Sequence, residues 1–326
     1  MPTQPKTLAA ELWSLAKSFS RVMAGYLLLI LTIVVVRFPS HTDPVGERSV
    51  ARPANYEEYY AGVYAQPKQG KESATEDSSD GRYVKMARDA IADQHVTQRL
   101  TEFVSLFGLE KARILDVGSG TGYLQDVVEK YVGLDISPTA ARYYHKPFIE
   151  ASATNMPIPD NDFDAAWSIW VLEHVPAPEQ ALLEIRRVVK DGGLIFMVPA
   201  WNVYPWAADG YPVRPFGDLN WNGKLTKAAM FAVEYKPLAQ AVKMTTRASL
   251  GARTLFSGPT HLHYNRLKPN YEKYWMQDSD AINSLDRYEM QLWFTSRGDE
   301  CLNCQGGFWQ MSDQLMIRVH KSGGGR

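Results

Sequence analysis

The residues of this chain best suited to chemistry form a glycine-rich loop that follows a short apolar run. The run is Ile114-Leu115-Asp116-Val117, and the loop is Gly118-Ser119-Gly120-Thr121-Gly122. Glycines at alternate positions let the backbone adopt positive φ and approach a ligand without an intervening Cβ. We expect a buried strand, then this loop, then a helix over residues 123–130 whose N-terminal amides face the same ligand. The pattern predicts a nucleotide-like ligand at the carboxyl end of a buried strand.

A second apolar run, from Val132 to Ser137, predicts a neighbouring strand that ends in Asp135, 19 positions after Asp116. A carboxylate at this place can accept hydrogen bonds from both ribose hydroxyls of a nucleotide. The dinucleotide fingerprint G-x-G-x-x-G requires glycine where this chain has Tyr123, which disfavours a nicotinamide-dependent oxidoreductase. Two structural alternatives stay open: Asp116 could cap the turn that follows it, and Asp135 could cap a helix together with Ser137.

Further elements follow in order along the chain. The sequence predicts a helix over 82–107, a loop over 155–164, a strand over 165–172 closing in Glu173-His174-Val175, an amphipathic helix over 178–189 that stops at 191–193, and a strand over 194–198. Over residues 82–200 this order resembles the class I S-adenosylmethionine-dependent methyltransferases of the type 11-like group. The resemblance implies an α/β fold with a Rossmann-like seven-stranded sheet sandwiched by helices. To this fold the chain adds a large insertion after strand five and an N-terminal hydrophobic helix.

The resemblance also implies S-adenosyl-L-methionine as the cofactor, bound at the carboxyl ends of the strands. It assigns the cofactor contacts to Asp116, Gly118, Ser119, Gly120, Gly122, Asp135, Ile136, Ser152, Ala153, Met156 and Trp170. Ser152 replaces a commonly acidic position, and an uncharged hydroxyl should hold the adenine amine more weakly than a carboxylate does. Trp170 stands where quinone-directed relatives carry a glutamate of a metal site, so we expect no metal of that kind. Packing in the core is the alternative role for Met156.

Two adjacent residues, Glu173 and His174, are the candidates for catalysis. Methyl transfer is an in-line displacement in which positioning supplies much of the rate, and a general base helps when the acceptor is a hydroxyl. His174 follows the fourth strand, near the entrance of an acceptor, and its ordinary pKa suits a base. Alternatively, His174 is structural, with its imidazole bonded to a backbone group or a neighbouring acid. His261 and His263 are then the other candidates for the base. We favour oxygen over carbon or nitrogen as the methyl acceptor.

Composition agrees with one large α/β domain plus attachments. The chain has 326 residues, 45% of them hydrophobic, and a formal net charge of −1. This near-neutral balance gives no reason to expect nucleic acid as a partner. Two cysteines provide no disulfide framework and suit a reducing compartment. We expect Cys301 and Cys304 to be reduced thiols on a turn, and a zinc site that they share with His261 and His263 is the alternative.

Residues 22–36 carry no charge and are bracketed by Arg21 and Arg37. Fifteen helical residues extend about 22 Å, short of a hydrocarbon core of about 30 Å, and snorkelling arginines could make up the difference. We interpret the segment as an uncleaved anchor that contacts the lipid bilayer, either as a short span or in the interface, where residues 8–20 could add an amphipathic helix. A signal peptide and a buried helix are the alternatives. Basic residues on the two sides are balanced, and the cytosolic supply of the cofactor places the catalytic domain on the cytoplasmic side.

These observations divide the chain into a membrane-anchor helix (1–38), a tether and lid (39–81), the cofactor-binding core (82–200), a substrate-side insertion (201–288), and the last two strands with a tail (289–326). The tyrosines of residues 56–64 order over the cofactor or, alternatively, pack on the domain surface. The aromatic and basic residues of the insertion suit a sugar, an aromatic ring or a lipid-linked headgroup. We expect the last two strands at 290–294 and 314–319.

The function predicted from the sequence is methyl transfer, with O-methylation favoured, to a small-molecule, glycan or lipid-linked acceptor at the membrane surface. The alternative is a catalytically silent subunit that keeps the methyltransferase fold and assembles with a partner in a membrane complex.

Overall fold

The computed structural model describes residues 8–37, 40–42, 56–62, 64, 79–233, 243–244, 247–248, 251–252, 259–271, 274–309 and 312–321. Most of the expected tether and the glycine-rich tail lie outside the described residues.

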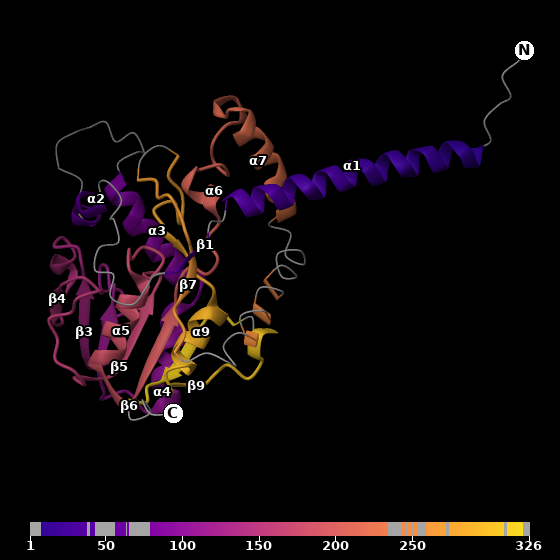
Figure 1. Ribbon diagram of the computed structural model, residues 1–326. Coiled ribbons are helices and arrows are strands. Elements are labelled where there is room, and N and C mark those ends of the chain that lie inside the picture. Colours follow the sequence, from indigo (N-terminus) through magenta and orange to yellow (C-terminus); the bar gives the residue numbers. More distant parts are fainter. Residues whose placement is uncertain are drawn as a thin grey trace, which may run out of the picture.

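A mostly parallel sheet forms the centre of the molecule, with strand order β4-β3-β2-β5-β6-β10-β9 (Figure 1). Its strands are β2 (Arg113–Val117), β3 (Lys130–Asp135), β4 (Phe148–Glu150), β5 (Phe163–Ile169), β6 (Val189–Val198), β9 (Glu300–Cys301) and β10 (Leu315–Arg318). Strands β2 to β6 pair in parallel, whereas β10 runs antiparallel to both β6 and β9. The expected seven-stranded α/β sheet is confirmed, and the strand expected at 314–319 is β10.

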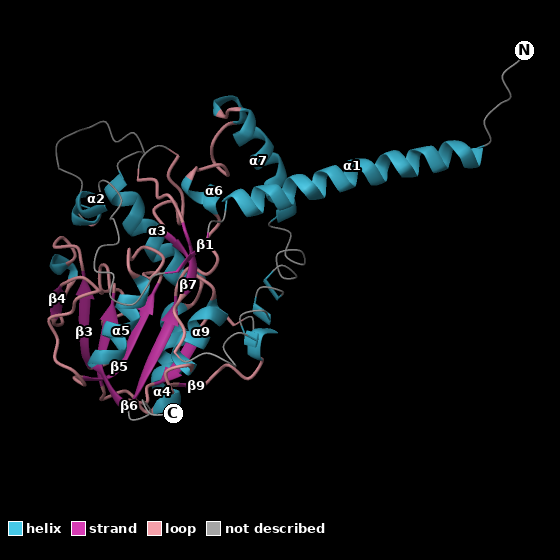
Figure 2. Ribbon diagram, viewed as in Figure 1, coloured by secondary structure: helices cyan, strands magenta, loops and turns pink. Residues whose placement is uncertain are grey.

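Helices cover both faces of this sheet (Figure 2), because successive residues of its buried strands point to opposite sides. Ile114 and Leu115, neighbours in β2, belong to two separate apolar clusters. The Ile114 cluster includes Leu100 of α4 (Val96–Phe107). The Leu115 cluster includes Leu182 of α5 (Pro178–Val188) and Trp293 of α9 (Arg287–Thr295). The β2 strand that carries the glycine-rich loop is therefore fixed from both sides.

The prediction of a helix over residues 123–130 is wrong. Residues 123–129 form turns and bends, because β3 already begins at Lys130. Backbone hydrogen bonds between residues three positions apart hold this short connection. For example, Val127 N donates to the Leu124 carbonyl at 3.1 Å. No helix N-terminus therefore faces the ligand at this loop.

Two other elements differ from expectation. The segment 290–294 is helical and lies within α9, which Asp286 caps by accepting a hydrogen bond from Tyr288 N at 2.9 Å. The long helix expected over 82–107 is two helices, α3 (Ser79–Asp93) and α4, because His95 takes a left-handed conformation with φ of 51° between them.

The insertion after β6 builds a second sheet together with the N-terminal segment. Strands β1 (Ser40–Thr42), β7 (His263–Arg266) and β8 (Asn283–Ser284) pair antiparallel in that order. Before β7 the insertion contains α6 (Pro205–Ala208), the 3₁₀ turn η2 (Phe216–Asp218) and α7 (Trp221–Val233). Other 3₁₀ turns are η1 (Ala141–Tyr143) and η3 (Gly307–Trp309).

Strand β8 fastens the insertion to the segment that follows β5. Ile282 N and Asn283 N both donate to the Glu173 carbonyl, at 2.8 and 2.9 Å. The Asn283 Nδ2 atom donates to the Val175 carbonyl at 2.7 Å. The insertion thus fixes the backbone on both sides of His174.

Helix α1 (Leu8–Arg37) is one continuous helix of 30 residues that extends away from the sheet (Figure 1). Residues 8–20 continue into the apolar segment rather than forming a helix of their own. The described residues contain one helix that could cross a membrane by length and composition, Leu12–Thr32, with 21 residues and a mean hydropathy of 1.3. At 1.5 Å per residue this is about 32 Å, close to a hydrocarbon core of about 30 Å. A signal sequence near an N-terminus would have the same properties.

The cysteines differ from expectation as well. Cys301 and Cys304 are joined by a disulfide, because the turn after β9 brings their Cα atoms to 5.5 Å, a separation that a disulfide spans. The bond uses both thiolates on which the zinc alternative depended.

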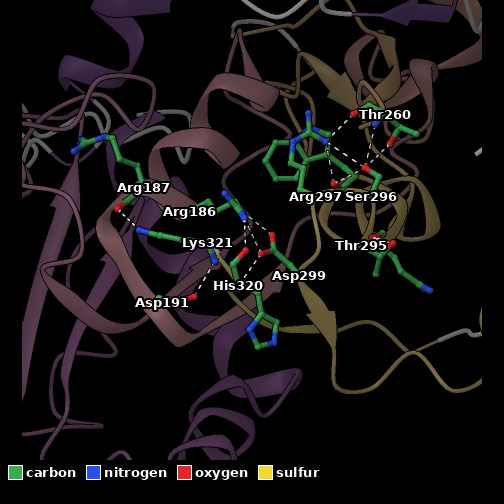
Figure 3. Close-up of polar contacts among 12 residues, drawn as sticks. Arg186, Arg187, Asp191, Thr260, Thr295, Ser296, Arg297, Asp299, His320 and Lys321 are labelled. Carbon is green, nitrogen blue, oxygen red and sulfur yellow. Dashed lines mark hydrogen bonds and ion pairs between the residues drawn. The ribbon is translucent and has the colours of Figure 1, made fainter. Parts of the chain in front are cut away.

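A polar network joins α5 to the end of β10 (Figure 3). Arg186 donates to both carboxylate oxygens of Asp299, at 2.8 and 3.1 Å, and to the His320 carbonyl at 2.8 Å. Asp299 also accepts from His320 N at 2.9 Å, and its side chain is fully buried. These bonds hold the antiparallel edge of the sheet against the helix layer.

Candidate active site

Two adjoining cavities open at the carboxyl ends of β2, β3 and β5, and share the lining residues Tyr64, Tyr83, Gly118 and Trp170. The first cavity is also lined by Tyr56, Tyr60, Leu134, Asp135, Ile136, Ala151, Ser152, Ala153, Val171, His174 and Val175. The second is also lined by Val84, Ala87, Ile91, Asp116, Ser119, Gly120, Thr121, Tyr123, Leu124 and Ile169. This is the edge at which open parallel sheets bind ligands.

The glycine-rich loop lines both cavities. Gly118 and Gly120 have φ of +73° and +53°, in the left-handed region that glycine adopts without strain. The amides of Gly118 and Ser119 donate to the Leu134 carbonyl at 2.7 and 3.0 Å, which ties the loop to β3. A Cβ on Gly118 would collide with the Val171 side chain. Backbone conformation and close packing therefore both require glycine at this position.

Asp135 ends β3 with its carboxylate between the loop and the first cavity. Its Oδ2 atom accepts from Gly120 N at 2.8 Å, and its Oδ1 atom accepts from Ser137 N at 2.9 Å. Burial raises the pKa of Asp135 to about 6, against the opposing effect of these amide hydrogen bonds. The bond from Ser137 closes a turn and caps no helix, because the next helical element, η1, begins only at Ala141. A carboxylate oxygen also has a second acceptor site that can serve a ligand hydroxyl.

Asp116, near the end of β2, lines the second cavity. Its Oδ2 atom accepts from the Tyr131 hydroxyl at 2.7 Å. Burial raises the pKa of Asp116 to about 7, although the hydrogen bond from Tyr131 lowers it. No lysine or arginine among the described residues forms an ion pair with this carboxylate, so the cavity beside it favours a positively charged group.

The structure brings most of the other expected contact residues to the first cavity, namely Ile136, Ser152, Ala153 and Trp170. Two of the expected contact residues line neither cavity. Gly122 faces Tyr144, which a Cβ would approach to 2.9 Å. Met156 is buried in the core, and its amide donates to Glu184 Oε2 at 2.8 Å. The core alternative therefore describes Met156 in this structure.

Tyrosines from the N-terminal segment close the first cavity. Tyr56 and Tyr60 belong to α2 (Tyr56–Gly62), Tyr64 follows it, and Tyr83 comes from α3. The Tyr143 hydroxyl donates to the Tyr64 carbonyl at 3.1 Å, which attaches this segment to the core. The tyrosine segment therefore lines the first cavity, and its ordering over bound cofactor as a lid stays a prediction.

His174 is the predicted base that reaches the cavity, and it is surrounded by carboxylates. Its Nδ1 atom lies 3.4 Å from Oδ2 of Asp280, and its Nε2 atom lies 3.8 Å from Oε1 of Glu173. The Tyr60 hydroxyl donates to the same Oδ2 atom of Asp280 at 3.0 Å. Burial lowers the pKa of His174, but the carboxylates of Asp280, Glu173 and Asp278 outweigh it, so the net pKa is raised.

Glu173 lies behind His174 and lines neither cavity. Its side chain is fully buried, and no group among the described residues makes a hydrogen bond to either carboxylate oxygen. Burial raises the pKa of Glu173 to about 7, although the charge of His174 lowers it. Glu173 can thus act on an acceptor only through His174.

The alternative bases lie elsewhere. His261 Nδ1 is 3.5 Å from Glu179, His263 Nδ1 is 3.5 Å from Glu289, and neither histidine lines either of the two cavities described above. Within the part of the chain that the structure describes, no three His, Cys, Asp or Glu side chains form a group that could hold a metal ion.

The two cavities fit S-adenosylmethionine by their chemistry. The Thr121 hydroxyl of the second cavity is buried and has no hydrogen-bond partner among the described residues, so it is available to a polar ligand group. Asp116 and Asp135 provide negative charge for a cationic sulfonium. Ile136 and Ala153 provide an apolar surface for a base, beside the Ser152 hydroxyl.

Residues 115–197 match the family model of the methyltransferase domain. The chain carries a methyltransferase domain. The matched range runs from β2 to the end of β6 and contains most of the residues of the two cavities. The match indicates S-adenosylmethionine as the cofactor of this domain.

Curated relatives and solved structures of methyltransferases are similar to the chain. The ubiquinone/menaquinone biosynthesis C-methyltransferase UbiE of Cupriavidus pinatubonensis is 29% identical, covering 40% of this chain and 60% of the relative. That of Cupriavidus necator is 28% identical, covering 48% and 70%. The chain thus spans about 60% of the first of these relatives. A SAM-dependent methyltransferase structure from Thermotoga maritima has a TM-score of 0.37 and 16% identity, covering 74% of this chain and 96% of that chain.

Several residues that line or support the site were not assigned from the sequence. Asp280 lies in the insertion without a recognisable motif, and Tyr83 lies on a helix expected only to pack. Thr121 belongs to the glycine-rich loop, and a hydroxyl residue among three glycines could have indicated a ligand contact. Tyr60 was foreseen only as part of a tyrosine-rich segment.

Proposed function

We propose that this protein transfers a methyl group from S-adenosylmethionine to a hydroxyl of a small-molecule, glycan or lipid-linked acceptor at a membrane surface. The observation that carries the proposal is that the methyltransferase domain match covers most of the residues that line the two cavities. The cofactor supplies a methyl group activated by the positive charge of its sulfonium. The protein then has to hold the cofactor, orient the acceptor and manage one proton.

We assign the first cavity to the adenosine part of the cofactor and the second to its methionine part. Asp135 accepts hydrogen bonds from the ribose hydroxyls while the amides of Gly120 and Ser137 hold its carboxylate in place. Asp116 and Thr121 face the methionine part, one as a carboxylate and the other as an unpaired hydroxyl. The geometry supports this division because the glycine-rich loop lines both cavities.

We assign the acceptor proton to His174. The imidazole lines the first cavity, and Asp280 at 3.4 Å can stabilise the positive charge that the ring gains when it takes a proton. Glu173 supports the ring from the other side at 3.8 Å. The C-methyltransferase name of the similar proteins makes carbon the competing acceptor atom, while the available base supports oxygen.

Helix α1 supports the membrane part of the proposal. Its apolar stretch Leu12–Thr32 is long enough to cross a bilayer, and only 6% of that stretch is buried within the protein. An enzyme held at the bilayer gains effective concentration toward acceptors that reside there. Since S-adenosylmethionine is made in the cytosol, we propose that the methyltransferase domain lies on the cytoplasmic side.

Calorimetric titration tests the cofactor assignment directly. S-adenosylmethionine and S-adenosylhomocysteine are titrated into the full chain in detergent, together with the Asp135→Asn and Asp126→Asn variants. Losing a hydrogen bond to a charged group costs about 1.5–3 kcal/mol, so Asp135→Asn should weaken binding roughly 10- to 100-fold. Asp126 is an exposed aspartate outside both cavities, and its variant should bind like the original protein.

Failure to bind either compound by the folded full chain contradicts the proposal. That result, combined with stable co-purification of a membrane partner, would support the catalytically silent subunit instead.

A further inference from the structure

Helix α7 presents an apolar face that no described part of the protein covers. Trp221 and Leu225 lie one turn apart on this helix, with 79% and 44% of their surface exposed. The opposite side of α7 is buried, at Thr226, Ala229 and Met230. The helix is therefore packed on one side and leaves large apolar side chains in contact with solvent on the other.

The loop before α7 extends this surface. Val213 and Phe216 are 55% and 49% exposed. Lys227 of α7 donates to the Arg214 carbonyl at 2.5 Å, and its ammonium lies 5.6 Å from the centre of the Phe216 ring. These contacts place the loop beside the helix. We call the surface formed by Val213, Phe216, Trp221 and Leu225 the α7 face.

Basic groups border the α7 face. The Lys224 ammonium lies 5.7 Å from the centre of the Trp221 ring, and Lys227 stands next to Phe216. One acid of the segment, Asp218, accepts a hydrogen bond from the Tyr274 hydroxyl. Exposed tryptophan with apolar neighbours and bordering lysines is typical of surfaces that enter the headgroup region of a membrane.

Helix α7 packs against the helix that could span the membrane through its buried side, which leaves the α7 face exposed next to that helix. Ile30 of α1 packs in one cluster with Trp206 of α6 and with Ala229 and Met230 of α7, and Tyr26 packs against it. Tyr26 and Ile30 lie six and two residues before Thr32, the end of the apolar stretch. At 1.5 Å per residue these positions are about 9 and 3 Å inside that end, and interfacial helices lie about 5–10 Å deep.

We propose that α7 and the loop before it lie in the interface of a lipid bilayer that contains anionic lipids, with the α7 face toward the acyl chains. The proposal rests on the proposed membrane placement of α1 and adds a second, independent point of contact. Two contacts fix the orientation of the domain relative to the bilayer, which a single helix with a connecting segment does not.

Helix α6, which packs in one cluster with α7, is joined to the acceptor side of the active site. The Ser279 hydroxyl donates to the Ala207 carbonyl of α6 at 2.8 Å. The next residue, Asp280, is the carboxylate that contacts His174. A bilayer that holds α7 and the loop before it would therefore lie near α6 and the segment that contacts the base, so an acceptor could enter from the membrane.

Depth-dependent fluorescence quenching tests the proposal on the full chain in vesicles. An environment-sensitive fluorophore is attached to Leu225→Cys, to Val22→Cys on α1, and to the matched control Leu106→Cys, which is 70% exposed on α4. The unsubstituted protein, with its Cys301–Cys304 disulfide intact, is treated in parallel as a labelling control. The vesicles contain phosphatidylcholine with or without phosphatidylglycerol. In one series the lipids carry a quencher near the headgroup, which reports on position 225, and in a second series near the middle of the acyl chains, which reports on position 22 at the centre of Leu12–Thr32.

An interfacial helix lies about 5–10 Å deep, within reach of a quencher near the headgroup. Quenching of the label at position 225 by about two-fold or more, without quenching at position 106, therefore supports the proposal. Lys224→Gln should raise the phosphatidylglycerol fraction needed for half-maximal quenching, whereas Lys111→Gln, exposed and distant in the fold, should not. Quenching at position 22 but not at 225 overturns the inference and leaves the anchor intact. Quenching at neither position overturns both. A signal at 225 that depends on protein concentration and not on lipid assigns the α7 face to a second copy and overturns the inference.

Discussion

Replacing Asp280 by asparagine should lower the pKa of His174. The carboxylate lies 3.4 Å from Nδ1 of the imidazole. At an effective dielectric constant of 20 this separation corresponds to about 5 kcal/mol, an upper limit equivalent to between 3 and 4 pKa units. Opposite charges at such distances shift a pKa by about 1–3 units in practice. We therefore expect the pKa of His174 to fall by about 1–3 units in Asp280→Asn. Burial still disfavours the charged imidazolium, and the nearest compensating carboxylate is gone.

This pKa can be measured without knowing the acceptor. The chain has seven histidines, so the ring resonance of His174 in ¹³C-histidine spectra is assigned from its loss in His174→Gln. The exposed Asp89→Asn variant controls for the general loss of one negative charge. Tyr60→Phe removes the hydrogen bond to Asp280 and keeps the charge, so the pKa of His174 should not fall. If His174 titrates at the same pH in Asp280→Asn and in the original protein, the assignment of Asp280 as the carboxylate that stabilises the protonated ring is wrong.

Two further predictions concern stability. Asp299→Ala leaves the largely buried Arg186 without its carboxylate partner and should lower the free energy of unfolding by about 3 kcal/mol. Asp126→Ala, at an exposed pair, should change it little in the same urea titrations. Glu173, with a pKa of about 7 against 4.5 for an unperturbed glutamate, binds more protons folded than unfolded in this window. The contribution of Glu173 to the free energy of unfolding should therefore be fully present below the unfolded pKa and be lost as the pH rises toward 7. Glu173→Gln should flatten this pH profile.

The part of the site that could be predicted from the sequence is the part that local patterns determine. The glycine-rich loop and Asp135 each follow an apolar run directly, so the ends of their strands are marked in the chain itself. Parallel strands place such ends at one edge of a sheet. His174 was found in the same way, because it follows the next strand of the pattern.

The rest of the site depends on contacts between distant segments. Tyr60 and Asp280 are separated by 220 positions and meet only because α2 and the insertion converge on His174. The segment 290–294 shows a different limit: a run of five largely apolar residues suits a strand or a buried helix, and the cap at Asp286 decides in favour of the helix. The C-x-x-C spacing likewise carried no information on whether the two sulfurs bond.

The path of the chain links helix α1, the insertion and His174 through consecutive strand pairings and hydrogen bonds. Strand β1 follows α1 after two residues and pairs with β7, and β7 pairs with β8. Strand β8 in turn begins at Asn283, whose amide binds the Glu173 carbonyl and whose side chain binds Val175. Only backbone pairing and one buried asparagine separate the end of α1 from His174. A movement of the proposed membrane helix relative to the domain would therefore be transmitted to the base, so we expect the position of the bilayer to influence the acceptor site more than the cofactor cavities.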